Sequence, residues 1–349
     1  MKRAGFDVHL IAPADEDSVD DGVIVHAVPK FSSRLLRMLI CPLAILRKLA
    51  FKKYKLVHFH DPELIWVGIV LRISGKKVIF DVHENIAEQI TSKDWLPLRK
   101  LIAKLYIAID YISAKCFVLI LAELSYVDIY KQYTSDYHVI LNYPDIDLLA
   151  EHHVTRRDSA SIFYIGGVSK ERGIDTVLNA LHLLHSKNIY FEFHCVGTCS
   201  PALLAEIREW NVYQEISDRV VFYGRRDIKE GYKISQKCIL GISILKPIGN
   251  YRNSYSTKIF EYMAVGMPVI TSDFQLYRDV VQASDCGICV DPEDPCQLAN
   301  ALGRLLTDHQ EAQRMGQNGR MAVERIYNWR KEDEKLLALY RKLLAAAPS

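Results

Sequence analysis

Short apolar runs rich in β-branched residues alternate along the chain with longer segments of helical periodicity. Each run is almost continuously apolar, which is typical of strands buried on both faces of a parallel sheet. The runs lie at residues 8–12, 23–26, 56–59, 77–80, 117–120, 138–141, 161–165, 191–196, 220–223, 239–243, 268–271 and 287–290. These twelve runs exceed the strands of one ordinary sheet, so the pattern predicts an α/β fold with two doubly wound, parallel-sheet domains.

A polar stretch over residues 142–158 follows the sixth run and lacks apolar periodicity, so we predict a linker there. We therefore expect one domain at residues 1–150 and a second at residues 151–329. Leucines at helical spacing in the segment 330–349 predict an amphipathic C-terminal helix, which we expect to pack back on the first domain.

Composition narrows the class of protein without identifying it. Of the 349 residues, 50% are hydrophobic and 25% are charged, which excludes a disordered chain. The net charge of +2 lacks the basic excess of a nucleic-acid-binding protein. No apolar stretch reaches the ~18 uncharged residues of a membrane span, and no signal peptide opens the chain, so we expect a cytoplasmic protein. We expect the eight cysteines to be free thiols in a reducing compartment, because several lie inside apolar runs. Cys286-x-x-Cys289 resembles half of a zinc site, but no second ligand pair follows it.

The segment 30–55 departs strongly from the mean charge. It carries eight lysine and arginine residues and no acidic residue, with leucines interleaved at helical spacing. A basic amphipathic helix of this kind suits docking on an anionic lipid surface. An ordinary helix packed on the sheet, with a solvated basic face, explains the pattern equally well.

Two motifs in the second half could carry chemistry. In the first, the run 161–165 ends in Gly166-Gly167, and a polar loop containing Arg172 leads into a helix. Glycines at a strand end let backbone amides approach a phosphate, the helix N-terminus adds partial positive charge, and an arginine adds a bidentate donor. A tight turn with a solvated arginine is the alternative.

The second motif opens a helix with Ser256-Thr257-Lys258 and places Glu261 in its first turn. An acidic residue in a nucleotide site accepts hydrogen bonds from ribose hydroxyls. A capping box, in which Glu261 bonds only to the backbone, is the alternative. Gly266 and Pro268 are predicted to end this helix and begin the next strand.

Together these motifs resemble the nucleotide-sugar-binding half of retaining glycosyltransferases of family 4, which have the GT-B fold. The segment Glu261-Tyr-Met-Ala-Val-Gly-Met-Pro-Val269 matches the family's second motif closely, and Arg172-Gly173 fills its Lys-Gly position. The resemblance implies two Rossmann-like domains facing across a cleft. It also implies transfer of a sugar from a nucleotide-diphosphate sugar to a saccharide or lipid-linked acceptor in cell-surface polysaccharide or lipopolysaccharide assembly.

The resemblance also implies roles for individual residues. Glu261 would hold the donor ribose, and Arg172 would bind the diphosphate with amides near Gly166 and Gly167. His83, beyond a strand's carboxyl end, matches the histidine that orients the sugar, so we expect His83 and Glu261 to be the catalytic residues. The remaining expected donor-binding positions are Gly224, Arg225, Asn253, Thr257 and Lys258.

Two departures from the family pattern stand out. Asn253 occupies the position of the family's first glutamate, so it can hydrogen-bond a sugar hydroxyl but carries no charge. Residues 2–13 resemble the end of the family's first helix and its second strand, so we expect the first strand and glycine loop to be missing from the N-terminal domain. The loss of a central strand would leave strand edges uncovered.

We expect no metal and no other cofactor. His58 and His60 share one face of a strand and invite a metal interpretation, but the GT-B family generally needs no bound metal. The implied partners are the nucleotide-sugar and the saccharide or lipid-linked acceptor. The segment 30–55 adds an anionic membrane surface as a candidate partner, and we expect no nucleic acid. Two alternatives stay open: a nucleotide-sugar 2-epimerase, which shares the fold, and an inactive, truncated nucleotide-binding or scaffold protein.

Overall fold

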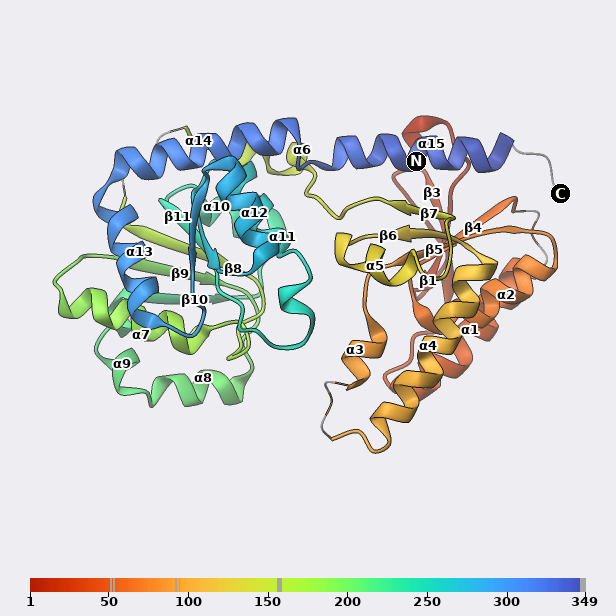
Figure 1. The fold of residues 1–349 in the computed structure, drawn as a ribbon, viewed down its shortest axis with the longest axis horizontal. Coiled ribbons are helices and arrows are strands. Elements are labelled where there is room, and N and C mark those ends of the chain that lie inside the picture. Colours follow the sequence, from red (N-terminus) through yellow and green to blue (C-terminus); the bar gives the residue numbers. More distant parts are fainter. Residues whose placement is uncertain (51, 53, 92, 94, 156–158, 346–349) are drawn as a thin grey trace. The chain divides into compact units, whose positions relative to one another are not determined.

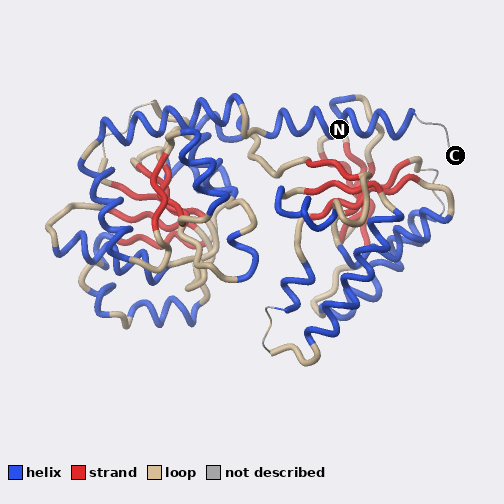
Figure 2. Tube along the Cα trace, in the orientation of Figure 1, coloured by secondary structure: helices blue, strands red, loops and turns tan. Residues whose placement is uncertain are grey.

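The computed structural model describes residues 1–349 except 51, 53, 92, 94, 156–158 and 346–349. The chain divides into two compact units (Figure 1). Unit 1 comprises Met1–Leu141 and Glu332–Ser349, and unit 2 comprises Asn142–Lys331. In each unit the strands lie inside and the helices lie outside (Figure 2).

Unit 2 holds a six-stranded sheet in the order β10-β9-β8-β11-β12-β13, and every neighbouring pair is parallel. Its strands are β8 (Ser161–Ile165), β9 (Glu192–Val196), β10 (Val220–Gly224), β11 (Leu240–Ser243), β12 (Val269–Ser272) and β13 (Gly287–Val290). The strand order reverses direction between β8 and β11. In doubly wound sheets, ligands bind at the carboxyl ends of the strands beside such a switch point.

Helices cover both faces of this sheet because its strands are apolar on both sides. Phe163 packs into one buried core and its neighbours Ile162 and Tyr164 into another. The helices of unit 2 are α6 (Ile146–Leu149), α7 (Ile174–Ser186), α8 (Pro201–Arg208), α9 (Asn211–Gln214), α10 (Ile228–Ser235), α11 (Thr257–Ala264), α12 (Gln275–Ser284), α13 (Pro295–Thr307) and α14 (His309–Arg325), with 3-10 turns η4 (Ala150–His152), η5 (Ser217–Arg219) and η6 (Gly249–Arg252). This architecture fits the doubly wound domain that the pattern predicts.

The strands of unit 1 form two separate sheets. One has the order β1-β3-β2 and the other β4-β5-β6-β7. The strands are β1 (His9–Pro13), β2 (Ser18–Asp20), β3 (Val23–Val28), β4 (Leu56–Phe59), β5 (Lys77–Val82), β6 (Val118–Leu121) and β7 (Tyr137–Val139). β1 and β4 each lie at a sheet edge and are mostly half-exposed, whereas β5 and β6 are almost entirely buried.

The long helices of unit 1 are α1 (Arg34–Ala50), α2 (Ile65–Ile73) and α4 (Arg99–Cys116), which lie side by side in Figure 1. Shorter elements are α3 (Ile86–Thr91), α5 (Val127–Tyr130), η1 (Lys2–Ala4), η2 (Pro62–Leu64) and η3 (Leu124–Tyr126). The C-terminal helix α15 (Trp329–Ala345) starts in unit 2, and from Glu332 onward it belongs to unit 1. There Lys77 Nζ donates to the Leu343 carbonyl at 2.5 Å.

All twelve predicted strands overlap strands of the structure, and α15 overlaps the predicted C-terminal helix. The short strand β2, which pairs antiparallel with β3, was missed because only one of its three residues is apolar. The units divide at Leu141/Asn142 rather than at the expected residue 150. The reason is that Ile146 and Leu149 are buried in the core of unit 2, so the polar stretch before 150 is no free linker. Unit 2 ends at Lys331, two residues after the expected boundary at residue 329.

Among the described residues, no helix has both the length and the apolar character that a membrane span requires. All eight cysteines are free thiols, and Cys286 is buried in the second core.

Candidate functional site

Three neighbouring strands of unit 2 end in glycines. Gly166, Gly197 and Gly224 follow or close β8, β9 and β10, with φ of 141°, 142° and 68°, a region that side chains disfavour. A Cβ on Gly197 would lie 1.8 Å from the Gly166 carbonyl oxygen, and the Gly197 amide donates to the Gly224 carbonyl at 2.9 Å. The strand ends are therefore packed backbone against backbone. The sequence reasoning missed Gly197, although a third strand-ending glycine was visible.

Two cationic side chains flank the first of these glycines. A Cβ on Gly166 would lie 3.4 Å from both Arg172 Nη1 and Lys258 Cε. Arg172 immediately precedes Gly173, whose φ of 69° turns the chain into the N-terminus of α7. Lys258 is in the first turn of α11, which follows β11 across the switch point. The topology thus brings two cations, a helix N-terminus and open backbone to one place.

Aromatic side chains hold these cations in position. Tyr164 Oη donates to the Gly167 carbonyl at 2.6 Å, and Lys258 Nζ lies 5.9 Å from the centre of the Tyr164 ring. Arg172 also hydrogen-bonds to the side chains of Tyr164 and Tyr251. Burial, together with the neighbouring Arg172 charge, lowers the pKa of Lys258 to about 8. A bound anion between the two cations would relieve their repulsion.

Glu261 lies one turn after Lys258 and faces a buried tyrosine. Tyr232 Oη, from α10, donates to Glu261 Oε2 at 2.6 Å. Burial and the charge of Glu261 raise the pKa of Tyr232 far above its usual value, so its hydroxyl stays a donor. The carboxylate is therefore oriented by a side chain, and Ser256 makes no side-chain cap bond, which disfavours the capping-box interpretation. No sequence signal marks Tyr232.

The remaining expected donor residues lie on the rim of this region. Thr257 is exposed at the first position of α11, and Asn253 is exposed directly after η6. Gly224 and Arg225 are exposed at the end of β10, where Gly224 connects to Gly166 through Gly197. Their roles toward a donor stay predictions.

His83, the expected catalytic histidine of unit 1, lies in a cluster around a buried carboxylate. Asp81 in β5 lies close to three imidazoles: its Oδ1 is 3.2 Å from His83 Nε2, and its Oδ2 is 3.3 Å from His58 Nε2 and 3.2 Å from His60 Nδ1. His60 Nδ1 is also 3.2 Å from His83 Nε2. The paired spacings His58-x-His60 and Asp81-x-His83 at two strand ends were the signal for this cluster, but sequence reasoning did not join them.

The charges in this cluster support one another. Burial alone would raise the pKa of Asp81, but hydrogen bonds from His58, His60 and His83 outweigh it and hold that pKa well below its usual value. The same Asp81 raises the pKa of His83, against partial burial. Burial lowers the pKa of His58, which therefore stays neutral.

Within the described residues, His58, His60 and Asp81 offer donor atoms within 4.8 Å of one another, a spacing that one metal ion could bridge. The same contacts are also explained by hydrogen bonds from the histidines to the carboxylate. The expectation that the protein binds no metal stays a prediction.

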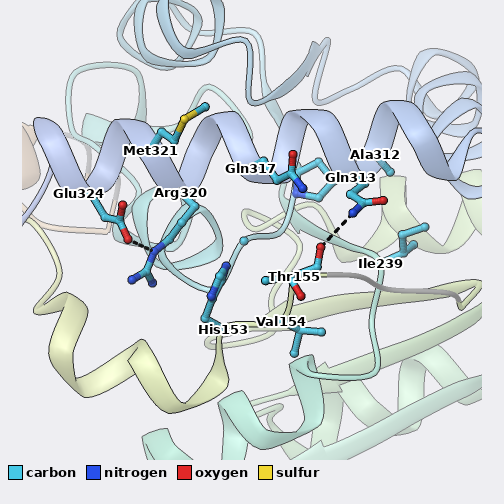
Figure 3. Close-up of a pocket in the computed structure, with 12 residues that line it drawn as sticks. His153, Val154, Thr155, Ile239, Ala312, Gln313, Gln317, Arg320, Met321 and Glu324 are labelled. Carbon is cyan, nitrogen blue, oxygen red and sulfur yellow. Dashed lines mark hydrogen bonds and ion pairs between the residues drawn. The ribbon is translucent and has the colours of Figure 1, made fainter.

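A cavity of about 350 Å³ in unit 2 lies away from the glycine strand ends. Figure 3 shows it against α14, where Gln313 Nε2 donates to the Thr155 carbonyl at 3.1 Å and Arg320 Nε pairs with Glu324 at 2.7 Å. Ile239 places it at the amino end of β11. Because α/β sites form at the carboxyl ends of strands, we place the candidate site at the glycines instead.

Comparison with known proteins identifies the family. The model described as glycosyl transferases group 1 matches residues 145–322, and glycosyltransferase family 4 matches residues 1–121. The capsular polysaccharide biosynthesis glycosyltransferase CapM of Staphylococcus aureus is 21% identical over 203 residues, which are 56% of this chain and 49% of the relative. The chain spans less than half the length of the curated relatives it matches.

Solved structures show the fold. Sucrose-phosphate synthase from Thermosynechococcus elongatus superposes with a TM-score of 0.77 at 21% identity, covering 99% of this chain and 91% of that one. Anabaena HepE in complex with UDP-glucose superposes with a TM-score of 0.68 at 15% identity, covering 92% and 86%. The predicted GT-B class is thereby confirmed. With a family model that matches about half of its length, this chain belongs to the glycosyl transferases group 1.

Proposed function

We propose that this protein is a retaining glycosyltransferase that moves a sugar from a nucleotide-diphosphate sugar to a saccharide or lipid-linked acceptor in cell-surface polysaccharide assembly. The observation that carries the proposal is the convergence of Arg172, Lys258 and Glu261 on the glycine-lined strand ends of unit 2. HepE is a structural neighbour solved with UDP-glucose, and CapM is a sequence relative in capsular polysaccharide biosynthesis.

Each part of a nucleotide-sugar would find a matching group. The diphosphate would lie between Arg172 and Lys258, over the backbone of Gly166 and at the N-terminus of α7. Glu261, held by Tyr232, would accept hydrogen bonds from the two ribose hydroxyls. The exposed backbone after Gly224 would contact the base.

The reaction would break the bond between the sugar's anomeric carbon and the diphosphate oxygen. Negative charge grows on the leaving diphosphate, and the fixed cations stabilise it in the transition state. The acceptor hydroxyl attacks from the face that the diphosphate leaves, so the configuration is retained, and its proton passes to the departing phosphate. His83 would orient the sugar.

The proposal includes no metal or other cofactor. Arg172 and Lys258 supply the positive charge that a divalent cation supplies to diphosphates in other enzymes. Transfer should accordingly persist in excess EDTA, and loss of activity that only a divalent cation restores would contradict this part.

The direct test substitutes Glu261→Ala in the full chain and follows donor hydrolysis or transfer with a panel of UDP- and GDP-sugars. Each hydrogen bond to a charged group contributes about 1.5–3 kcal/mol, so losing two should lower kcat/KM by about 10²-fold or more. Glu209→Ala, at the exposed end of α8, is the matched control and should leave activity unchanged.

Two results would overturn the assignment. Full activity in the folded Glu261→Ala variant would show that the site lies elsewhere. Conversion of a UDP-sugar to its C2 epimer without acceptor would favour the epimerase, and no binding of any nucleotide-sugar would favour the inactive scaffold.

We also propose that unit 1 docks on an anionic membrane. Exposed apolar side chains follow α1 and α4, including Leu39 at 67%, Leu43 at 57% and Leu105 at 59% exposure. Several basic residues of the segment 30–55 form ion pairs with acidic residues. For example, Lys48 Nζ lies 3.2 Å from Asp17 Oδ1, so the positive charge of the segment is partly neutralised in the fold. α4 adds four basic residues against one buried aspartate. These exposed apolar and basic side chains suit anionic lipid.

Flotation with vesicles tests this docking. Vesicles rich in phosphatidylserine should capture the protein more strongly than phosphatidylcholine vesicles at low salt, and Leu105→Glu should weaken capture. Ile326→Glu, which changes an exposed apolar residue of unit 2, is the control. Equal capture by both vesicle types would contradict the proposal.

A further inference from the structure

The carboxylate at the centre of the histidine cluster has no role in the sequence-based picture of the site. Asp81 is 8% exposed, which is unusual for a charged side chain unless it is paired. All of its short contacts described above are to imidazole nitrogens, and only the contact at Oδ1 involves His83. A buried carboxylate with these neighbours can influence the orientation of the imidazole rings around it.

Two side chains flank the ring of His58. His58 is neutral, so one ring nitrogen donates and the other accepts. Its Nδ1 is hydrogen-bonded to Tyr340 Oη of α15. Its Nε2 lies 3.3 Å from Asp81 Oδ2, so Tyr340 and Asp81 flank the two nitrogens of the ring. The other carboxylate oxygen, Oδ1, lies 3.2 Å from His83 Nε2.

A second contact holds the backbone of His83. Tyr126 Oη donates to the His83 carbonyl at 3.0 Å, so the chain position is set while the ring is aimed by Asp81. The His83 Nε2 lies 3.2 Å from both Asp81 Oδ1 and His60 Nδ1, so Nδ1 is the ring nitrogen on the side away from the carboxylate. Glu84 and Glu123 also lie near His83, and their charges act in the same direction as that of Asp81.

We propose that Asp81 is a positioning residue for His83: it accepts the Nε2 proton and thereby fixes the tautomer and orientation in which Nδ1 meets the transferred sugar. Tyr340 and His58 hold Asp81 in the orientation that this requires. The proposal rests on the proposed glycosyl transfer, because it assigns His83 to the sugar.

Kinetics of Asp81→Asn test it in the full chain. The amide keeps the size of the carboxylate but cannot hold the ring in the same tautomer, and a comparable change elsewhere costs ~10⁴-fold in kcat. We expect kcat to fall by about 10²-fold or more, while KM for the donor changes by less than about threefold, because the donor residues lie in unit 2. Tyr340→Phe should give a smaller fall in kcat of about tenfold. Asp128→Asn, an exposed aspartate of unit 1, is the control.

Unchanged kcat in folded Asp81→Asn would overturn the proposal. A rise in KM for the donor as large as the fall in kcat would also overturn it. A structural readout keeps the test independent of folding failures and of the proposed activity. Long-range ¹⁵N–¹H spectra of the imidazoles in the intact wild-type chain should show the His83 proton at Nε2, and Tyr340→Phe should shift the His58 signals. A proton at Nδ1 of His83 would contradict the assignment even if no transfer were ever found.

Zinc titration separates this proposal from a metal site. Calorimetry with Zn²⁺ alone should show no stoichiometric binding that Asp81→Asn abolishes. Tight one-to-one binding lost in that variant would overturn the positioning role, because His60 and Asp81 would then be metal ligands.

Discussion

The two candidate sites of this molecule differ in construction: one relies on backbone packing and the other on titratable side chains. In unit 2, backbone packed against backbone at Gly166 and Gly197 forms the floor, and tyrosines hold the cations above it. In unit 1, the site is a network of titratable side chains around Asp81, at the half-exposed edge strand β4 and its buried neighbour β5. The first site leaves no room for a side chain at Gly197, whereas the second depends on the protonation of its histidines.

The surrounding sheets show the same contrast. Unit 2 has one continuous six-stranded sheet between two cores, whereas the described strands of unit 1 form two separate sheets. The lesson is that the donor side is rigid by packing, while the histidine side is held by hydrogen bonds. The following substitutions test that contrast, beginning with the largest expected effect.

Gly197→Ala should disrupt unit 2 most. The new Cβ would collide with the Gly166 carbonyl at 1.8 Å, and its φ of 142° is disfavoured for a side chain. Strain and overpacking together should lower the free energy of unfolding by roughly 3 kcal/mol and abolish donor binding.

Thermal melting and nucleotide binding measure this effect. Gly75→Ala in unit 1 is the control, because its φ of 84° is also positive but nothing lies within 4 Å of the added Cβ. That change should cost about 1–2 kcal/mol through backbone strain alone. Equal destabilisation by both substitutions would show that packing at the strand ends is not special.

Arg172→Ala should have the next largest effect. Removing one of two cations that face the leaving group should lower kcat by about 10²-fold, as removing a preorganised donor does elsewhere. Arg225→Ala should change kcat by less than about threefold, since only its backbone is expected near the base. Steady-state kinetics of both variants check the order, and a larger loss in Arg225→Ala would place the diphosphate elsewhere.

Donor affinity should depend on pH through Lys258. Its pKa of about 8 means that the charge is present at pH 7 and is lost as the pH rises through 8, so Kd for the nucleotide-sugar should rise up to about tenfold per pH unit above that value. Lys258→Gln should bind more weakly at pH 7 and lose this dependence. An unchanged pH profile in the variant would assign the titration to another group.

Much of this architecture was predictable because its signals are local. The apolar runs of β8 to β13 and the Gly-Gly and Glu261 motifs lie within short windows, where periodicity and turn chemistry act directly. The errors arose where few residues carry the signal. β2 has three residues, and the buried Ile146 and Leu149 stand in an otherwise polar stretch that looked like a linker.

By itself, the sequence determined the α/β alternation, every strand of both units except the short β2, and the motifs that match a glycosyltransferase family. Only the tertiary structure decided that Tyr232 orients Glu261, that Gly197 meets Gly166, and that Tyr340 reaches His58 over a separation of 282 residues. The physical reason is that periodicity tells which face of an element is buried, whereas the partner on that face is set by the packing of distant elements.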